Sequence, residues 1–180
     1  PEAVARLKGD RSYVAAFKKT FNEEVTAKGI AKALSSFQRA RLNGSSRVDA
    51  YESGQALALN AQEALGRALF HGKARCAGCH LGPNYTDEGF HNTGFLCTTD
   101  FGLEEATGRS ADRRLFKTPT LRAVGQTSPY MHDGSVDTLE AVVELYNAGG
   151  PHPANRDTEM RPLGLTAEEK AALVQFLKAL

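Results

Sequence analysis

The chain holds 180 residues, of which 41% are hydrophobic and 24% are charged, as in an ordinary globular domain. Its 22 basic and 21 acidic residues give a formal net charge of +1, which provides no field for recruiting nucleic acid or an anionic membrane surface. No apolar run is long enough to cross a bilayer, so we expect no membrane insertion. The chain begins at Pro1 rather than Met, and we expect that preceding residues were removed or left out.

Residues 1–42 have the pattern of helices. Two sets of apolar residues recur there at helical spacing. The first set is Tyr13, Val14, Phe17 and Phe21, and the second is Ile30, Ala33, Leu34 and Phe37. Asp10 and Thr26 stand where each helix needs an N-cap, and the turn residues 43–46 end the second helix. We expect the aromatic residues of this segment to lie in a core.

A further helix is predicted over residues 60–70. Asn60 and Glu63 have the spacing of a capping box, in which each side chain accepts a hydrogen bond from the other's backbone N–H. The apolar face consists of Leu65, Leu69 and Phe70. Gly72 then allows the chain to turn away from the helix.

The stretch Cys76-Ala77-Gly78-Cys79-His80 follows this turn. Two thiols three positions apart, with an imidazole directly after them, are the attachment signature of a c-type haem. One tight turn brings both sulfurs to the two vinyl groups of a porphyrin edge, and His80 then lies beneath the iron as its proximal ligand. We therefore predict one covalent haem c, attached through Cys76 and Cys79.

Two other interpretations of this motif are weaker. A C-x-x-C pair can be a redox disulfide, but the βαβ context of such a pair is missing. Cys76, Cys79, His80 and His91 could also be offered to zinc. The adjacent Cys79 and His80, however, do not easily occupy two corners of one tetrahedral site.

The haem motif also bears on the cellular compartment. Attachment of haem through cysteine needs reduced thiols and an assembly system on the export side, which favours the bacterial periplasm. Cys97 is then left without a partner cysteine, and burial as a small hydrophobic residue is its expected fate.

From residue 81 to about residue 135 the chain is rich in Gly, Pro, Thr and Asp, without a sustained helical period. A loop of this length is unusual in a compact domain. A porphyrin changes that expectation, because a large apolar plate can serve as the core for irregular chain on both of its faces.

Two helices complete the chain. Asp137 and Glu140 have capping-box spacing before a helix over 137–147, which Gly149-Gly150 stops. Thr166 and Glu169 form the same box before the terminal helix. We expect this terminal helix to cross the 60–70 helix as the main packing contact within the protein.

The predicted fold class is therefore mainly α. We expect a cytochrome-c-like helical domain around one covalent haem c over residues 53–180, with a long irregular segment that wraps the haem. Residues 1–52 are expected to form an N-terminal helical segment that packs on this haem domain.

The second axial position of the iron decides the chemistry, because a sixth ligand blocks substrate whereas an open site admits peroxide or oxygen. Spacing alone leaves Met131, Met160, His132, Tyr146 or no ligand. Met is the ordinary choice in electron-transfer cytochromes and raises the reduction potential, whereas a Tyr oxygen favours ferric iron. The residues by themselves rank Met131 first, since Tyr146 can equally be a core aromatic with a hydrogen-bonded hydroxyl.

Four further motifs, read together, resemble one family. They are Phe90-His91-Asn92-Thr93-Gly94, Phe116-Lys117-Thr118-Pro119-Thr120-Leu121-Arg122, Pro129-Tyr130-Met131-His132-Asp133-Gly134 and Thr138-Leu139-Glu140. With residues 162–166 they resemble the C-terminal half of the bacterial di-haem cytochrome c peroxidase and MauG family, over nearly the whole chain. The N-terminal half, with its own haem motif, is not in this sequence, and neither is the family's tryptophan between the two haems.

This resemblance implies roles for individual residues. His80 matches the proximal ligand. Tyr146 stands where peroxidases of the family have a distal Met, and MauG-like members use Tyr there, so the resemblance raises Tyr146 above Met131. Backbone oxygens of Thr127 and Pro129 match ligands of a calcium ion that also takes an Asn from the missing half. Here that site would be incomplete or completed by water.

Three other polar residues have two interpretations each. His132 matches a family residue near the distal side of the haem, and it can equally be a hydrogen-bonded loop histidine. Arg122 and Lys117 could pair with haem propionates through charge-assisted bonds. Residues of these types are more often solvated surface charges.

The prediction for function is the electron-transfer half of a periplasmic di-haem peroxidase or MauG-like oxidoreductase. The iron at His80 would shuttle one electron, with Tyr146 keeping it six-coordinate and Tyr146 and His132 as the catalytic candidates. Peroxide chemistry would occur at a second haem domain or subunit, and a small cytochrome or cupredoxin would donate electrons. The alternatives are a monohaem carrier with a Met ligand and an enzyme with an open distal site.

Overall fold

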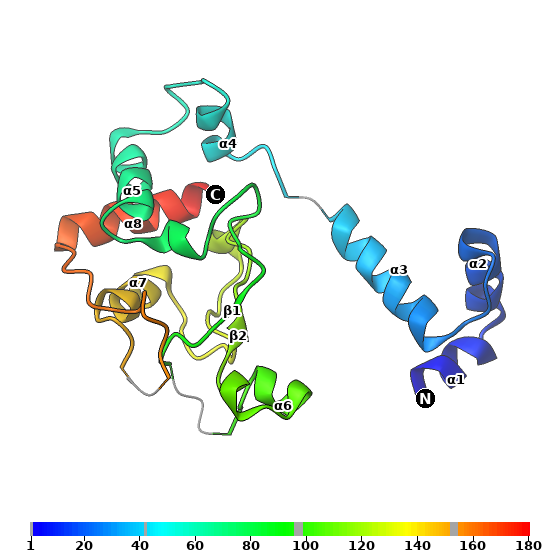
Figure 1. Ribbon diagram of the computed structural model, residues 1–180. Helices are drawn as coiled ribbons and strands as arrows, with labels where there is room; N and C mark the ends of the chain where they lie inside the picture. The colour runs from blue at the N-terminus through cyan, green and yellow to red at the C-terminus, as the bar shows by residue number, and fades with distance from the viewer. Residues whose placement is uncertain (1, 42, 96–98, 152–154) are drawn as a thin grey trace. The chain divides into compact units, whose positions relative to one another are not determined.

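The computed structural model describes residues 2–41, 43–95, 99–151 and 155–180, and it divides into two compact units, Pro1–Asn43 and Gly44–Leu180 (Figure 1). Helix α4 (Arg47–Glu52) belongs to the second unit, because Val48 and Tyr51 pack in that unit's core. The division thus falls before the predicted boundary at residue 52. The packing of residues 1–52 on the haem domain stays a prediction.

The first unit contains the helices α1 (Glu2–Gly9), α2 (Arg11–Phe21) and α3 (Ala27–Ala40). Both predicted caps are confirmed. The Asp10 carboxylate accepts a hydrogen bond from the Ser12 N–H at 2.8 Å, and the Thr26 hydroxyl accepts one from the Gly29 N–H at 3.0 Å. These side chains satisfy N–H groups that a helix start leaves without partners.

The interior of the first unit is small. Phe17 and Val25 are buried, whereas Tyr13 and Phe37 are 48% and 62% exposed. The prediction that the aromatic residues of this segment lie in a core is therefore wrong for Tyr13 and Phe37. A unit of this size has too high a ratio of surface to volume to bury every apolar side chain of its helices.

In the second unit, helix α8 (Ala167–Ala179) packs on both α5 (Ala61–His71) and α7 (Leu139–Asn147) (Figure 1). The contact between α5 and α8 is the largest between any two described elements, which confirms the predicted crossing. Both predicted capping boxes are present at the starts of α5 and α8.

The α5–α8 crossing depends on a glycine. A Cβ atom built on Gly66 would lie 2.1 Å from the Ala172 carbonyl oxygen, so only glycine allows the two helices to approach this closely. Phe70 and Phe176 meet at the same crossing, with ring centroids 5.1 Å apart. Leu65 is 47% exposed, so its predicted place on the apolar face is wrong.

The remaining core residues surround this crossing. They include Leu59, Leu69, Tyr85, Val124, Leu139, Val143, Leu165, Leu173, Val174, Leu177 and Leu180. The core therefore takes its residues from α4, α5, α7, α8 and the connecting segments, within one unit.

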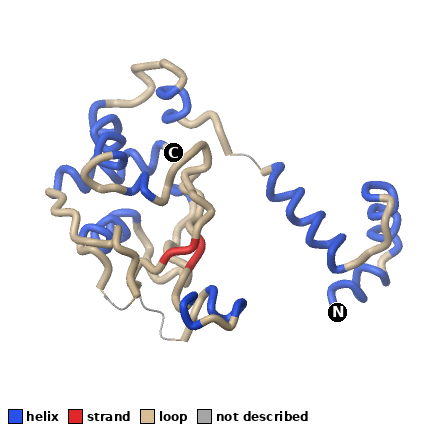
Figure 2. Tube along the Cα trace, in the orientation of Figure 1, coloured by secondary structure: helices blue, strands red, loops and turns tan. Residues whose placement is uncertain are grey.

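The described residues between 81 and 135 are mostly irregular, as predicted (Figure 2). Their regular parts include the short helix α6 (Leu103–Thr107), two 3₁₀ turns over Ser110–Asp112 and Val124–Gln126, and a two-stranded antiparallel sheet. In that sheet β1 (Phe90–His91) pairs with β2 (Phe116–Lys117). The fold is thus mainly helical, with a long loop region in its middle.

The N-cap of helix α7 lies one residue later than predicted. Its N-cap is Thr138, whose hydroxyl accepts a hydrogen bond from the Ala141 N–H at 3.2 Å, rather than Asp137. Gly149 and Gly150 follow its C-terminus with φ of +85° and +76°, a conformation that favours glycine. A Cβ atom on Gly150 would lie 2.4 Å from the Thr93 carbonyl oxygen.

None of the helices in the described part of the chain is both long enough and apolar enough to cross a lipid bilayer.

Candidate haem-binding site

The Cys76–His80 motif forms a tight turn directly after α5. Arg75 has φ of +53°, and a 3₁₀ turn over Cys76–Gly78 follows it. The His80 N–H donates to the Cys76 carbonyl oxygen at 2.9 Å, which closes the turn. The predicted geometry, with both sulfurs and the imidazole gathered on one turn, is therefore present in the backbone.

Both motif cysteines are free and half-buried. Burial raises the pKa of the Cys76 thiol to about 12. Burial, followed by the negative charges of Asp87 and Asp157, raises the pKa of Cys79 to about 11. Both groups are therefore protonated at neutral pH. A catalytic redox pair needs a thiol with a lowered pKa, so these values argue against the disulfide interpretation.

His80 is oriented by a backbone carbonyl. Its Nδ1 lies 2.9 Å from the Tyr85 carbonyl oxygen, which can only accept a hydrogen bond, so Nδ1 carries the proton. The lone pair of Nε2 is then free for a metal. Burial lowers the pKa of His80, which keeps the ring neutral at neutral pH. A neutral, oriented imidazole is what an axial haem ligand has to be.

Tyr146 comes from α7 and lies near the motif. Its ring meets the Phe95 ring edge to face, with centroids 5.5 Å apart. Burial raises the pKa of the Tyr146 hydroxyl to about 12, and the charges of Cys76 and Cys79 act in the same direction. Tyr146 is half-buried, and its hydroxyl lies within electrostatic reach of both thiols.

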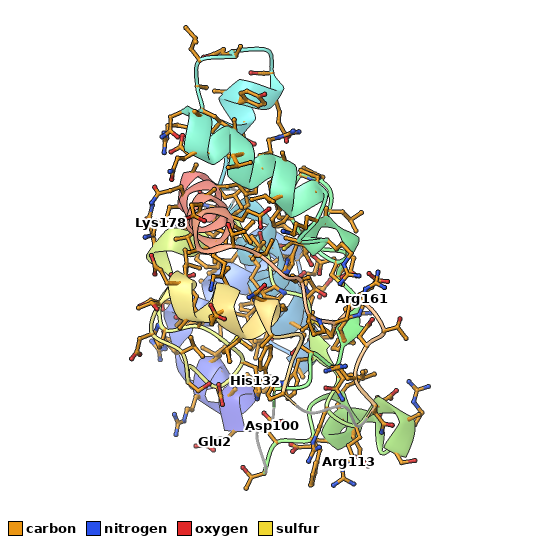
Figure 3. All side chains as sticks on the ribbon, turned by 90° about the vertical axis from the view of Figure 1, so that its left-hand side faces the viewer. Glu2, Asp100, Arg113, His132, Arg161 and Lys178 are labelled. Carbon is orange, nitrogen blue, oxygen red and sulfur yellow. The ribbon has the colours of Figure 1, made fainter. Side chains whose placement is uncertain are left out.

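The other candidate ligands lie in loops. Met131 is half-buried with φ of +71°, and Met160 is half-buried in the loop before α8. His132 is exposed (Figure 3), and its ring stacks on Phe116 with centroids 3.8 Å apart. These positions do not test which residue is the sixth ligand.

Lys117 and Arg122 both have acidic partners within the protein. Lys117 forms an ion pair with Glu88, and the Arg122 Nη1 donates to both Asp49 oxygens at 2.7 Å. In the described structure, both residues predicted to pair with haem propionates are therefore already paired with carboxylates of the protein.

Thr127 and Pro129, the residues offered to calcium, are exposed in the loop after Val124. The Thr127 hydroxyl donates to the Val124 carbonyl oxygen at 3.2 Å. Their assignment as calcium ligands stays a prediction. Cys97 lies outside the described residues.

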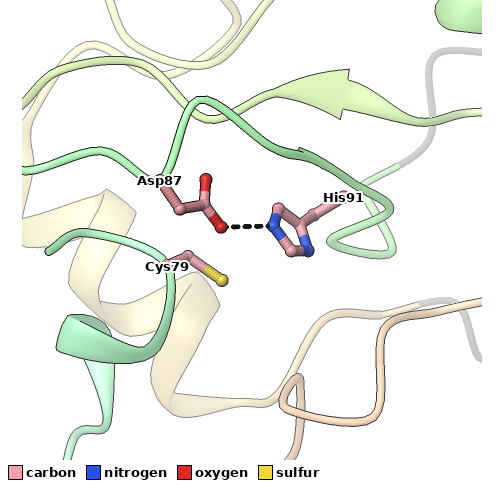
Figure 4. A group of neighbouring side chains, drawn as sticks. All are labelled: Cys79, Asp87 and His91. Carbon is pink, nitrogen blue, oxygen red and sulfur yellow. Dashed lines mark hydrogen bonds and ion pairs between the residues drawn. The ribbon is translucent and has the colours of Figure 1, made fainter.

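Cys79, Asp87 and His91 gather on one side of the motif, with one ligand atom from each within 4.8 Å of the others (Figure 4). This set differs from the one that the sequence offered to zinc. His91 Nε2 lies 2.8 Å from Asp87 and Nδ1 lies 2.7 Å from Asp157, so both ring nitrogens donate and the ring is an imidazolium. Although burial acts to lower it, these two bonds raise the pKa of His91 above its ordinary value. The cluster is therefore an ion-pair network.

Three residues beside the motif had no signal in the sequence. The Tyr85 carbonyl that orients His80 is a backbone group, which every residue type supplies. Asp87 and Asp157 lie 70 positions apart in the chain, and only the fold brings both of them to His91.

Comparison with known proteins defines the class. A family model described as cytochrome c matches residues 63–180, and one described as di-haem cytochrome c peroxidase matches residues 1–57. The chain belongs to the cytochrome c family and, within it, to the group of di-haem cytochrome c peroxidases and MauG. The resemblance seen in its motifs is confirmed.

Particular relatives give the same assignment. The chain is 38% identical to the methylamine utilization protein MauG of Methylorubrum extorquens, over 98% of this chain and 51% of that protein. It is 35% identical to the cytochrome-c peroxidase IdrP1 of Denitromonas iodatirespirans, over 97% of this chain and 56% of the relative. The chain thus spans about half the length of the curated relatives it matches.

Solved structures agree on the fold. A MauG-like protein associated with microbial copper homeostasis superposes with a TM-score of 0.80 at 35% identity, covering 99% of this chain and 61% of the other. The di-haem peroxidase BthA of Burkholderia thailandensis has a TM-score of 0.77 at 24% identity, covering 99% and 58%. The predicted fold class, a mainly helical cytochrome-c-like domain, is therefore confirmed.

Members of this family bind haem c covalently, and the residues present fit that group. The thiols of Cys76 and Cys79 are free and protonated, and the Nε2 of His80 is available. Iron in such a domain supplies a one-electron redox couple.

Proposed function

We propose that this chain is the electron-transfer haem domain of a periplasmic di-haem oxidoreductase of the peroxidase and MauG type. In this proposal Cys76 and Cys79 hold one haem c, His80 is its proximal ligand and Tyr146 its distal ligand. The domain passes electrons to a peroxide-reactive haem outside this chain, or stores oxidising equivalents for it.

The position of the Tyr146 hydroxyl carries this proposal. Tyr146 is half-buried on α7, and its hydroxyl is close enough to Cys76 and Cys79 for these groups to act on its pKa. A phenol at this depth ionises readily only beside a cation, and ferric iron supplies one. A Tyr oxygen on the iron closes the sixth position, so this domain serves transfer of electrons rather than binding of peroxide.

The length of the relatives supports the proposal that electron transfer and peroxide chemistry occur at haems in different domains or subunits. This chain contains one C-x-x-C-H motif and matches about half of MauG and of IdrP1. We therefore propose that the peroxide-reactive haem lies in a second domain or subunit. A calcium ion on the backbone oxygens of Thr127 and Pro129, completed by the other half, belongs to the same proposal. So do His132 near the iron and a small cytochrome or cupredoxin as electron donor.

Replacing Tyr146 with Phe tests the proposal. The holoprotein should lose its sixth ligand, which the ferric absorption and electron paramagnetic resonance spectra report. Tyr130→Phe is the matched control, because Tyr130 is also a half-buried tyrosine and its hydroxyl donates to the Val124 carbonyl oxygen at 3.0 Å. We expect the Tyr130→Phe spectrum to equal that of the unchanged chain.

Three results would contradict the proposal. An unchanged ferric spectrum in Tyr146→Phe, with loss of the sixth ligand in Met131→Leu, would support a monohaem carrier. Rapid ferryl formation when peroxide is added to the isolated holoprotein would show an open distal site. A colourless wild-type protein, with the mass of the bare polypeptide, would refute the haem assignment itself.

A further inference from the structure

The loop after the haem motif holds the hydrogen-bond acceptor of His80 in an unusual backbone conformation. Tyr85 has φ of +51°, which costs energy for a residue with a side chain. Its ring is only 4% exposed and meets the Phe70 ring edge to face at 6.0 Å. Such a conformation persists only when the surroundings fix it. The contacts around residues 83–85 therefore show what holds the Tyr85 backbone in place.

Arg122 makes two of these contacts from a distant part of the chain. Its Nε donates to the Pro83 carbonyl oxygen at 2.7 Å, and its guanidinium lies over the Tyr85 ring, 5.3 Å from the centroid. Its Nη1 donates to both oxygens of Asp49 on α4, as described above. Only 12% of the Arg122 side chain is exposed, so this position is well defined.

Thr120 adds a third contact from the same segment. Its hydroxyl donates to the Asn84 carbonyl oxygen at 2.6 Å. Residues 83, 84 and 85 are thus each held from segment 120–122, two through their carbonyl oxygens and one through its ring. The Tyr85 carbonyl is then free to accept from His80 Nδ1 at 2.9 Å.

We propose that Arg122 is a positioning residue for the proximal side of the haem. By fixing loop 83–85 between α4 and its own segment, Arg122 holds the Tyr85 carbonyl against His80 Nδ1. It thereby sets the electron donation of the imidazole to iron. The proposal rests on the proposed function, in which His80 is the iron ligand.

The direction of the effect follows from the hydrogen bond. A carbonyl that accepts firmly from Nδ1–H makes the imidazole a more basic ligand, which favours ferric iron and lowers the reduction potential. Loosening loop 83–85 weakens this bond and raises the potential. Replacing Arg122 by a neutral residue would also remove a positive charge, which lowers the potential and obscures the result. The informative substitution therefore keeps the charge.

The experiment compares Arg122→Lys with Arg67→Lys in the full-length holoprotein. Arg67 is a close match, because it pairs with Glu52 on α4, its guanidinium lies 5.6 Å from the Tyr51 ring centroid, and its side-chain hydrogen bonds within the described structure go to Glu52 rather than to loop 83–85. Lys keeps the charge at both positions and loses the planar fork of donors. We measure the reduction potential and the ferric electron paramagnetic resonance spectrum of each variant.

We expect Arg122→Lys to lower the ferric-to-ferrous ratio at fixed potential at least threefold, about 28 mV at 59 mV per tenfold change. Its paramagnetic resonance spectrum should shift, and Arg67→Lys should match the wild type in both measurements. A wild-type potential in Arg122→Lys, or an equal shift in Arg67→Lys, would overturn the proposal.

If Arg122→Lys does not yield holoprotein, Thr120→Val decides the question, because it removes a neutral contact to the same loop. A raised potential supports the proposal, and an unchanged one overturns it. Failure of the proposed function looks different: the wild type itself would then lack haem, or its iron would lack a histidine ligand.

Discussion

The close approach of α5 and α8 predicts that Gly66→Ala destabilises the second unit. The added Cβ would lie 2.1 Å from the Ala172 carbonyl oxygen and 2.7 Å from the Phe176 Cβ, whereas ordinary contact begins at 3.4 Å. The helices would have to separate locally by about 1.3 Å, the difference between 3.4 and 2.1 Å. Because the nearest atoms belong to backbone, no side-chain rotation relieves the contact.

The size of the effect is a difference of two terms. Overpacking of this kind costs about 3 kcal/mol at the upper end of its usual range. Ala is favoured over Gly within a helix by about 1 kcal/mol. The net loss is therefore about 2 kcal/mol of unfolding free energy, or roughly 4–8 °C in melting temperature for a domain of this size.

Guanidinium unfolding of the holoprotein, followed by circular dichroism, measures this loss. Gly44→Ala is the control, because a Cβ atom there meets nothing within 4 Å and its φ is not in the left-handed region. We expect Gly44→Ala to be neutral or slightly stabilising. If Gly66→Ala were as stable as the wild type, the crossing would not be as close as described.

Further predictions concern the Arg47–Glu63 ion pair and the Asp87–His91–Asp157 network of the second unit. Glu63→Gln should lower the unfolding free energy by about 1.5–3 kcal/mol, because the Glu63 side chain is 3% exposed and accepts a charge-assisted bond from Arg47; a loss below that of the exposed Glu52→Gln would contradict this. The Asp87–His91–Asp157 network should make the unfolding free energy depend on pH in both the acid and the alkaline range. The pKa of Asp87, which burial raises and the bonds from the Gly89 N–H and His91 lower, falls to about 2, so its contribution is present at neutral pH and lost as the pH falls through that value. The raised pKa of His91 gives a contribution that is complete below the unfolded-state pKa and lost as the pH rises through the folded-state one. His91→Gln should abolish that alkaline loss in pH-dependent melting curves, and His71→Gln should leave it unchanged.

Local sequence patterns predicted the helix starts well. The boxes at Asn60 and Thr166 formed because a Ser, Thr or Asn followed three positions later by Glu satisfies helix N–H groups within a few residues. The start of α7 shows the limit of this rule. Asp137 and Thr138 are both good capping residues, and the pattern alone does not decide which one occupies the cap.

Burial was harder to predict, because it depends on partners far along the chain. Leu65 and Gly66 are neighbours on α5, yet α8 approaches at Gly66 and leaves Leu65 exposed. A hydrophobic pattern predicts burial of the leucine rather than the glycine, because it does not record where two backbones approach closely. The exposed Tyr13 and Phe37 show the same limitation.

The candidate site was predictable where chemistry requires a particular residue. Cys76, Cys79 and His80 are identifiable because no other residues form thioether bonds and an axial bond in that spacing. The Arg122 contacts and the His91 network depend on backbone carbonyls and on residues from distant segments. Those features became visible only in three dimensions.

The glycine pair after α7 offers a way to move Tyr146 without changing it. Gly150 rests on the Thr93 carbonyl, and a Cβ atom on Gly149 would lie 2.4 Å from the Pro162 nitrogen. Any side chain at either position would push the end of α7 outward, and the phenol three or four residues earlier would travel with it. In the proposed function, where the Tyr146 oxygen is the distal ligand, substitutions of increasing size there should lengthen the bond from this oxygen to iron in graded steps.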